Sequence, residues 1–346
     1  MTHDLSETDR YTSPEVFALV RGAVQDRWRY GLRGLGALLV VAATTASAQP
    51  ISILTFNLRS RLDHADRREP AIAAFLSEQR PDIVLFQEVA LLGGRERTQA
   101  HRMAQAGGYE VAHCHNARTR RGLAVLSRYP ILDSVVISLP PNGRPALAVT
   151  INVHGRTLSV VNVHLTPALE ARQVRSAEVR SALELLETMP GIGLLGGDLN
   201  FGDHDVESAL VGHLVDAYRQ VEPTSPGHTW DLRNPLARKN SFPTEPSRRL
   251  DRLLFAAPNG PTSPRVRVDS SELVLTLELT STVAPSDHYG LLSRVAFLDP
   301  PTSAGAGEPT QRGGSPLPES SRGVIGAAPV QGVTMSRKMQ DQRAHP

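Results

Sequence analysis

The pattern that most constrains the fold of this chain is a series of short apolar runs that each end in a polar residue. ILTF precedes Asn57, IVLFQ precedes Glu88, and SVVNV precedes His164. GLLGG precedes Asp198, and Asn200 follows one residue later. Such runs are typical of buried β-strands, and in open α/β sheets ligands bind where strands end at a common edge. The sequence therefore predicts one site built from the ends of several strands.

Strands and helices alternate along the body of the chain. Proline suits the first turn of a helix, so helices are expected from Pro70 to the residue before Pro81, and from Pro167, capped by Thr166, to about residue 187. Further helices are expected at 95–106 and near 205–210. The expected strands are 51–58, 83–89, a weaker one from 109, 122–127, 134–139, 146–153, 157–164, 192–197, 249–255, 271–277 and 288–297. These elements predict an α/β (α+β) fold in which two mixed β-sheets pack face to face under outer helices.

The two ends of the chain differ from this body. A basic stretch ending at Arg33, an apolar run from Leu35 and an A-x-A site ending at Ala48 are typical of a secretory signal peptide. We expect cleavage near Ala48 and a secreted or periplasmic protein, and a membrane anchor formed by the N-terminal segment is the alternative. Residues 300–346 are rich in Pro, Gly and Ser and predict a disordered tail. The expected segments are 1–48 (extension and signal peptide), 49–299 (catalytic domain) and 300–346 (tail).

The charge of the expected catalytic domain is balanced, because its basic and acidic residues are equal in number once the two ends are set aside. A nucleic-acid ligand would therefore need a local positive patch. Arg59 with Arg61, Arg67 and Arg68, and Arg121 with Arg118 and Arg120, form two candidate clusters. A solvated arginine-rich surface is the alternative for both.

Three oxygen-bearing side chains suggest a metal site. Glu88 and Asp287 supply carboxylates and Asn57 supplies an amide oxygen. Hard oxygen ligands of this kind suit Mg²⁺ or Mn²⁺, which often keep open positions for water and for substrate phosphate.

His288 and Asp251 form a second predicted unit, because an imidazole oriented by a carboxylate is a general base near neutral pH. Asp251 lies within the apolar strand RRLDRLLF, where an unpaired carboxylate is costly. It therefore needs a partner. His288 is one candidate, and Arg249 or Arg252 would serve for a purely structural role.

Asp198 and Asn200 alternate with Leu199, so both side chains point the same way if the backbone is extended. One is suited to orient a water or carry a proton, and the other to donate an amide hydrogen bond to a phosphoryl oxygen. His164 adds a further donor. Taken singly, a turn-forming Gly-Gly-Asp and a core histidine are the alternatives.

Six motifs occur in the order ILTFNL, IVLFQEV, VVNVHLTP, LLGGDLNF, RRLDRLLF and PSDHYGLL. In this order they resemble the motifs of the magnesium-dependent endonuclease/exonuclease/phosphatase superfamily, over roughly residues 51 to 298. This superfamily includes nucleases, sphingomyelinases, tyrosyl-DNA phosphodiesterases and inositol-polyphosphate phosphatases. The resemblance implies a four-layered α/β sandwich with its site where both sheets open.

The resemblance also implies roles, position by position. Glu88 is the expected main ligand of Mg²⁺ or Mn²⁺, with Asn57 and Asp287 close to the metal. His288, paired with Asp251, is the expected base or phosphate-contacting histidine. The remaining implied roles are positioning of water or a proton for Asp198, the transition-state amide for Asn200 and phosphate donation for His164.

The leading hypothesis is an exported phosphodiesterase acting on nucleic acid by in-line attack of water on a metal-bound phosphate. Arg59 and Arg121 are candidate substrate contacts. GHTWDLRNP resembles a segment of phosphodiesterase-like members, so Trp230 and Asn234 are further candidates. Trp230 either stacks on a base or packs at a strand end.

Other functions are weighed against this one. A sphingomyelinase or other phospholipid phosphodiesterase would need an exposed apolar hairpin for membrane contact. A noncatalytic binding module would normally have lost Glu88, Asp198 or His288, and all three are present. The segment before Asp251 lacks the proline-aromatic-cysteine pattern of inositol phosphatases, which disfavours that subgroup. We expect a monomer that binds its phosphodiester substrate and has no stable protein partner.

Overall fold

The computed structural model describes residues 49–92, 97–105, 107–115, 121–238, 244–256, 265–276 and 284–299. The predicted signal peptide and the predicted tail lie outside these ranges, as do Arg118 and Arg120. Among the helices in the described ranges, none is long and apolar enough to cross a membrane.

In the described ranges, twelve strands form two sheets of six strands each. The first sheet has the order β11 (Arg265–Val274), β12 (Gly290–Leu298), β1 (Ile51–Asn57), β2 (Ile83–Ala90), β4 (Arg121–Ser127) and β3 (Glu110–His115). The second has the order β5 (Ile131–Leu139), β6 (Arg144–Val153), β7 (Arg156–His164), β8 (Ile192–Asp198), β10 (Asp251–Phe255) and β9 (Val215–Asp216). Both sheets are mixed, as predicted, because β1 and β2 run parallel, as do β7 and β8, and the other pairs are antiparallel.

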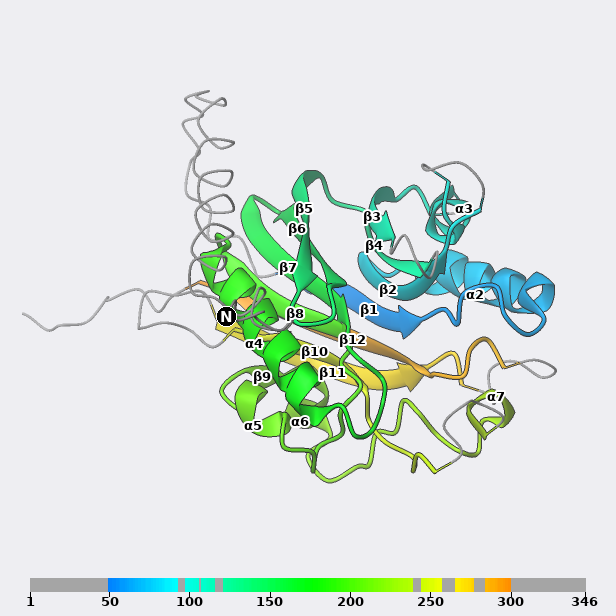
Figure 1. The fold of residues 1–346 in the computed structure, drawn as a ribbon. Coiled ribbons are helices and arrows are strands. Elements are labelled where there is room, and N and C mark those ends of the chain that lie inside the picture. The colour runs from blue at the N-terminus through cyan, green and yellow to red at the C-terminus, as the bar shows by residue number, and fades with distance from the viewer. Residues whose placement is uncertain are drawn as a thin grey trace, which may run out of the picture. The chain divides into compact units, whose positions relative to one another are not determined.

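Helices cover the outer faces of the two sheets (Figure 1). The helices α2 (Ala65–Gln79) and α3 (Gln99–Gln105) pack on the first sheet, and α4 (Arg172–Thr188) packs on the second. The short helices are α5 (Ser208–Val211), α6 (Ala217–Val221) and α7 (Pro235–Arg238). The order helix, sheet, sheet, helix confirms the predicted four-layered sandwich.

Alternation along each strand divides the core into layers. In β1, Ile51 and Ile53 face the second sheet, whereas Leu54 and Phe56 face α2. This follows from the two-residue period of a strand, which sends neighbouring side chains to opposite faces. A strand that is buried on both faces is therefore mostly apolar. In β1, ISILTFN, the polar residues are Ser52, Thr55 and the terminal Asn57.

Two helices do not begin at the proline residues from which their starts were predicted. Helix α2 begins at Ala65 and contains Pro70, because the buried guanidinium of Arg68 donates to carbonyls of the preceding loop and fixes the first turn early. Helix α4 begins at Arg172 instead of Pro167. Thr166 is not its cap, since the backbone N–H and hydroxyl of Thr166 both donate to Glu178 in the middle of that helix.

Strand directions bring the predicted polar residues to one edge. β1, β2, β7 and β8 end there, carrying Asn57, Glu88, His164 and Asp198. β10 and β12 run antiparallel to β8 and β1, so they begin at the same edge. Asp251, the first residue of β10, pairs directly with Asp198 in the register. Strand ends and strand starts thus build the site together.

Candidate active site

A cavity of about 300 Å³ lies at this edge. It is lined by Asn57, Arg59, Leu62, Glu88, Arg121, His164, Pro167, Asp198, Asn200, Trp230, Glu245, Leu250, Asp287 and His288. The structure thus places every predicted site residue except Asp251 and Asn234 on its wall. Asp251 lies directly behind His288.

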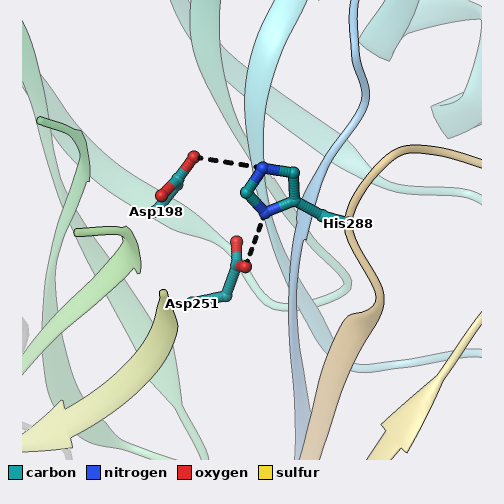
Figure 2. Close-up of side chains that lie close together, drawn as sticks. All are labelled: Asp198, Asp251 and His288. Atoms are coloured by element: carbon teal, nitrogen blue, oxygen red, sulfur yellow. Dashed lines mark hydrogen bonds and ion pairs between the residues drawn. The ribbon is translucent and has the colours of Figure 1, made fainter. Parts of the chain in front are cut away.

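His288 lies between two buried carboxylates (Figure 2). Its Nδ1 is 2.8 Å from Asp251 Oδ2, and its Nε2 is 3.7 Å from Asp198 Oδ2. The two arginines that were the alternative partners of Asp251, Arg249 and Arg252, instead pair with Asp203 and Asp216. Of the three candidate partners, Asp251 thus contacts His288, the one that the family resemblance implies.

Charge and burial set the protonation of these groups. Burial acts to lower the pKa of His288, but Asp251 and Asp198 outweigh it and raise that pKa well above its ordinary value. Burial raises the pKa of Asp198 to about 7, with Asp251 adding to the rise and His288 opposing it. Burial, with Arg144 beside it, holds the pKa of His164 well below its ordinary value. Near neutral pH, His288 is a cation, His164 is neutral and Asp198 is poised to exchange a proton.

Asp198 is held by the backbone and by amides. Asn57 Nδ2 donates to its Oδ2 at 3.0 Å, and the backbone N–H of Asn200 donates to its Oδ1 at 3.1 Å. Gly197 before it has φ +126°, and a Cβ there would lie 2.1 Å from the carbonyl oxygen of Val163, so only glycine fits. These contacts fix Asp198 against rotation.

Asn200 differs from the expectation of an extended backbone. Its φ is +54°, in the left-handed region that asparagine tolerates. Its side-chain amide donates to the carbonyl of Leu165 at 2.9 Å, yet the residue still lines the cavity. Asp198 and Asn200 thus reach the same cavity through a turn instead of through strand alternation.

Glu88 reaches the cavity because β2 contains a bulge. Its φ is +51°, and the pairing of β2 with β4 shifts register between Phe86 and Val89. A bulge re-aims a side chain that would otherwise follow the pleat. Burial raises the pKa of Glu88, and the charge of Asp287 adds to this rise. Arg121 opposes it, because its Nη1 lies 3.0 Å from Glu88 Oε2.

Asn57, Glu88 and Asp287, the predicted metal ligands, share the cavity wall. Their donor atoms are all oxygens, and the carboxylate of Asp287 adds to the rise in the pKa of Glu88. Two largely buried carboxylates beside an amide oxygen fit a hard divalent cation, which would relieve the repulsion between them. A different set, Asp198, Asp251 and His288, has ligand atoms within 4.8 Å of one another and is a second arrangement able to hold an ion.

Trp230 and Asn234 are placed differently from each other. Trp230 is 3% exposed and packs edge-to-face on His288, with ring centroids 5.2 Å apart. Trp230 thus packs at the strand end beside His288, which was one of its two predicted roles. The other role, stacking on a base of the substrate, stays a prediction. Asn234 is fully buried away from the cavity lining. Its amide donates to the carbonyl of Ser286 at 2.8 Å, so it holds the segment before Asp287 instead of facing substrate.

Sequence reasoning missed two charged residues at the cavity. Arg144 begins β6 and its Nε donates to the carbonyl of His164 at 2.5 Å, and it lines a side cavity of about 150 Å³ that shares Glu88, Arg121 and His164 with the main one. Glu245 lines the main cavity and pairs with Arg248. Arg144 lies beside His164 because β6 pairs antiparallel with β7, and no local signal in the sequence marks either Arg144 or Glu245.

Two buried arginines hold the loops that carry site residues. Arg68 donates to the carbonyls of Leu58 at 2.9 Å and Pro285 at 2.9 Å, linking the loops next to Asn57 and Asp287. Arg68 was expected in a basic patch, but it is fully buried and serves these carbonyls. Arg175 does the same for the loop after His164, donating to carbonyls at 166, 168 and 169.

Comparisons with known proteins agree with this geometry. The model of the Endonuclease/Exonuclease/phosphatase family matches residues 54–288. A comparison with curated protein sequences finds no match. Among solved structures, TDP2 of D. rerio complexed with single strand DNA product is 22% identical, with a TM-score of 0.61 over 71% of this chain and 98% of that one. TDP2 from C. elegans is 21% identical, with a TM-score of 0.57 over 86% of this chain and 95% of that one.

A third structure, the endonuclease/exonuclease/phosphatase from Bacteroides vulgatus, is 18% identical, with a TM-score of 0.57 over 72% of this chain and 99% of that one. These likenesses concern the fold, which all three share with the chain. The family model spans β1 to His288 and so includes every predicted site residue. The chain belongs to the Endonuclease/Exonuclease/phosphatase family.

Proposed function

We propose that this chain is a divalent-metal-dependent phosphodiesterase that hydrolyses nucleic acid. The observation that carries the proposal is His288, held by Asp251 and facing Asp198, on the wall of a cavity that also bears three oxygen ligands. Such a cavity offers a site for a cation, a donor for a phosphate and an acceptor for a proton.

Asn57, Glu88 and Asp287 would hold Mg²⁺ or Mn²⁺. When bound, such an ion supplies Lewis-acid stabilisation of charge on a phosphoryl oxygen. Glu88 would be the main ligand, because the bulge in β2 directs its buried carboxylate into the cavity. The hard oxygen donor set favours these ions over softer metals.

The remaining side chains bind the phosphate and move the proton. His288, cationic because of its two carboxylate neighbours, donates a hydrogen bond to a phosphoryl oxygen. Neutral His164 and the amide of Asn200 add donors along the same wall. Asp198, whose pKa is raised to about 7, accepts the proton of the attacking water. The in-line geometry then places water and leaving group on opposite sides of phosphorus.

Local charge favours nucleic acid as the substrate. Arg59 and Arg121 line the cavity and Arg144 lines its side branch, so guanidinium groups able to contact phosphate lie at the site within a body that is neutral overall. Phosphate contacts of this kind supply most of the affinity of nucleic-acid binding. The similar D. rerio TDP2 structure contains a single strand DNA product, which supports the same substrate class.

Export is a further part of the proposal. It rests on the leader-like sequence before Ala48. Mass spectrometry of the protein from its natural host tests it, because export predicts a mature chain beginning at Gln49. Intact chain found only inside the cell would overturn this part.

Turnover of defined substrates tests the proposed reaction. The purified protein is incubated with plasmid DNA, RNA, sphingomyelin and a chromogenic phosphodiester, each with Mg²⁺, Mn²⁺ or EDTA. We expect cleavage of nucleic acid that EDTA abolishes and that His288→Ala reduces at least a hundredfold. His213→Ala, which removes an exposed histidine, is the matched control and should retain activity. Cleavage of sphingomyelin alone would show that the substrate is a phospholipid. Full activity of His288→Ala would overturn the catalytic role proposed for His288.

A further inference from the structure

All three predicted cation ligands are engaged by two arginines. The guanidinium of Arg59 pairs with Asp287, and its backbone N–H donates to Asn57 Oδ1 at 2.9 Å. The guanidinium of Arg121 lies 3.0 Å from Glu88 Oε2. Asp287 and Glu88 are mostly buried, with side chains 7% and 17% exposed, so these pairs are only partly screened by water.

The local backbone directs Arg59 toward these ligands. Arg59 and Ser60 both have positive φ, at 52° and 48°, which turns the chain sharply after β1. The buried guanidinium of Arg68 fixes that turn through the carbonyls of Leu58 and Ser60. A non-glycine pair in the left-handed region costs free energy, so the turn is maintained by its surroundings.

A guanidinium and a divalent cation compete for the same carboxylate. Each favours the ionised oxygen, and the two positive charges repel when both are close. A cation that binds Glu88 and Asp287 must therefore displace Arg121 and Arg59 or share the carboxylates with them. A displaced guanidinium in this cavity matches an anionic group such as a phosphate. Arg59 also keeps its ion pair with Asp63, 44% exposed, at 2.6 Å, which holds the guanidinium near the site after it leaves Asp287.

Building on the proposed function, we propose that Arg59 and Arg121 are exchangeable counter-ions of the cation ligands. They neutralise Asp287 and Glu88 while the cation is absent, and cation binding releases them to the phosphate of the substrate. The exchange weakens cation binding to the free protein and makes cation and substrate bind cooperatively. By linkage, each then raises the affinity of the other by the same factor.

The same two strands carry a matched pair far from the cavity. Arg128 directly follows β4, which Arg121 begins, and Asp82 directly precedes β2, which carries Glu88 near its end. Arg128 Nη1 lies 3.3 Å from Asp82 Oδ1, and its side chain is 35% exposed against 40% for Arg121. Arg128 is therefore a control with the same kind of ion pair and similar exposure at the other end of the strand.

Binding of Mn²⁺ alone tests the proposal without turnover. Free Mn²⁺ is measured by electron paramagnetic resonance for the wild-type protein and for Arg59→Gln, Arg121→Gln and Arg128→Gln. We expect Arg59→Gln to bind Mn²⁺ about tenfold more tightly, a shift that corresponds to about 1.4 kcal/mol. We expect about a threefold gain for the more exposed Arg121→Gln, and no change for Arg128→Gln.

The outcomes separate this inference from the proposed function. If the wild-type protein binds no Mn²⁺, the metal dependence fails and the inference fails with it. If the wild-type protein binds Mn²⁺ but both cavity variants bind it equally well or more weakly, only the exchange is overturned. Arg121→Gln keeps the test sound should Arg59→Gln misfold, because the side chain of Arg121 is 40% exposed and that of Arg59 is 11% exposed.

Cooperativity gives a second readout. Binding of a short fluorescent DNA oligonucleotide is measured by anisotropy in the Asp198→Asn background, with and without Mn²⁺. We expect Mn²⁺ to tighten oligonucleotide binding at least fivefold in this background and less than twofold once Arg59→Gln is added. Equal tightening in both proteins would contradict the release of Arg59 to phosphate.

Discussion

Asp198 and Asp203 lie five residues apart and show opposite electrostatics. Asp198 is fully surrounded by protein, and burial raises its pKa to about 7. Burial acts on Asp203 in the same direction, but Arg249 and Arg252 outweigh it and hold the pKa of Asp203 below its ordinary value. One carboxylate is kept ready to take a proton, and the other is kept ionised.

The neighbours of each carboxylate explain the difference. Asp203 and Asp216 form a cluster with three arginines, Arg219, Arg249 and Arg252, in which each carboxylate contacts at least two cations. Asp198 instead lies among Asp251, His164 and His288, where a second carboxylate adds to its pKa. Charge matching outweighs burial in the first region, whereas in the second burial dominates and the cation of His288 offsets it only in part.

The comparison teaches that burial alone does not identify a catalytic carboxylate. Both regions contain deeply buried ionisable groups, and the cluster around Asp203 contains more charges. The cavity differs from the cluster around Asp203 because its wall carries more carboxylates than arginines, and these carboxylates face open space. Glu88 and Asp287 are intermediate between these two cases. Each pairs with an arginine, as Asp203 does, but these arginines and carboxylates all line the cavity, as Asp198 does.

The largest expected effect separates the two aspartates by activity. Asp198→Asn removes the proton acceptor while keeping the shape of the side chain, so we expect kcat to fall by about 10²- to 10⁴-fold. Asp203→Asn should stay within about threefold of wild type, since Asp203 does not line the cavity. Steady-state kinetics at pH 7 with the best substrate measures both. A comparable loss in both variants would break the comparison.

Stability should show the reverse order. Asp203→Asn leaves Arg249 and Arg252, which are 2% and 4% exposed, with one fewer carboxylate. Removing one partner of a buried ion pair is strongly destabilising, and the 26% exposure of Asp203 reduces the effect to about 2 kcal/mol. Urea unfolding at pH 7 measures it. Asp269→Asn, in an exposed pair with Arg267, is the control and should leave the midpoint unchanged.

The convergence of the site residues was predictable because it depends on simple rules. Apolar runs ending at Asn57, Glu88, His164 and Asp198 mark strands, and parallel neighbours end at one edge. The cost of an unpaired buried carboxylate predicted that Asp251 has a partner, and the family resemblance implied that this partner is His288. Local pattern and elementary energetics were therefore enough to name most of the cavity wall and the four-layered fold.

What escaped prediction depends on long-range packing. Arg144 reaches the site because β6 runs antiparallel to β7, which places the start of β6 beside His164. The starts of α2 and α4 depend on Arg68 and Arg175, whose guanidinium groups hold loop carbonyls and so override the signals of Pro70 and Pro167. Such contacts join residues that are far apart in the sequence or on different strands, so local sequence patterns do not predict them.

Acid should remove the stabilising contribution of Asp203. Its pKa is lower in the folded than in the unfolded chain, so its contribution is complete above about pH 5 and is lost as the pH falls through the ordinary value of about 3.9. We expect the deficit of Asp203→Asn relative to wild type to shrink from about 2 kcal/mol at pH 6 to less than about 1 kcal/mol at pH 3. Urea unfolding at both values measures it, and a deficit that grows in acid would contradict it.

The sharpest contrast between the two aspartates is the pH dependence of Asp198→Asn stability, measured in EDTA. The pKa of Asp198 is higher in the folded than in the unfolded chain, so wild type is penalised progressively as the pH rises from about 4 to about 7. Asparagine avoids this penalty but loses the hydrogen bond from Asn57. We therefore expect the stability of the variant relative to wild type to rise between pH 4.5 and pH 7, by up to about 3 kcal/mol. The deficit of Asp203→Asn should stay nearly constant over the same range, because the contribution of Asp203 is already complete above about pH 5. A difference for Asp198→Asn that is equally flat would show that the folded protein does not raise the pKa of Asp198.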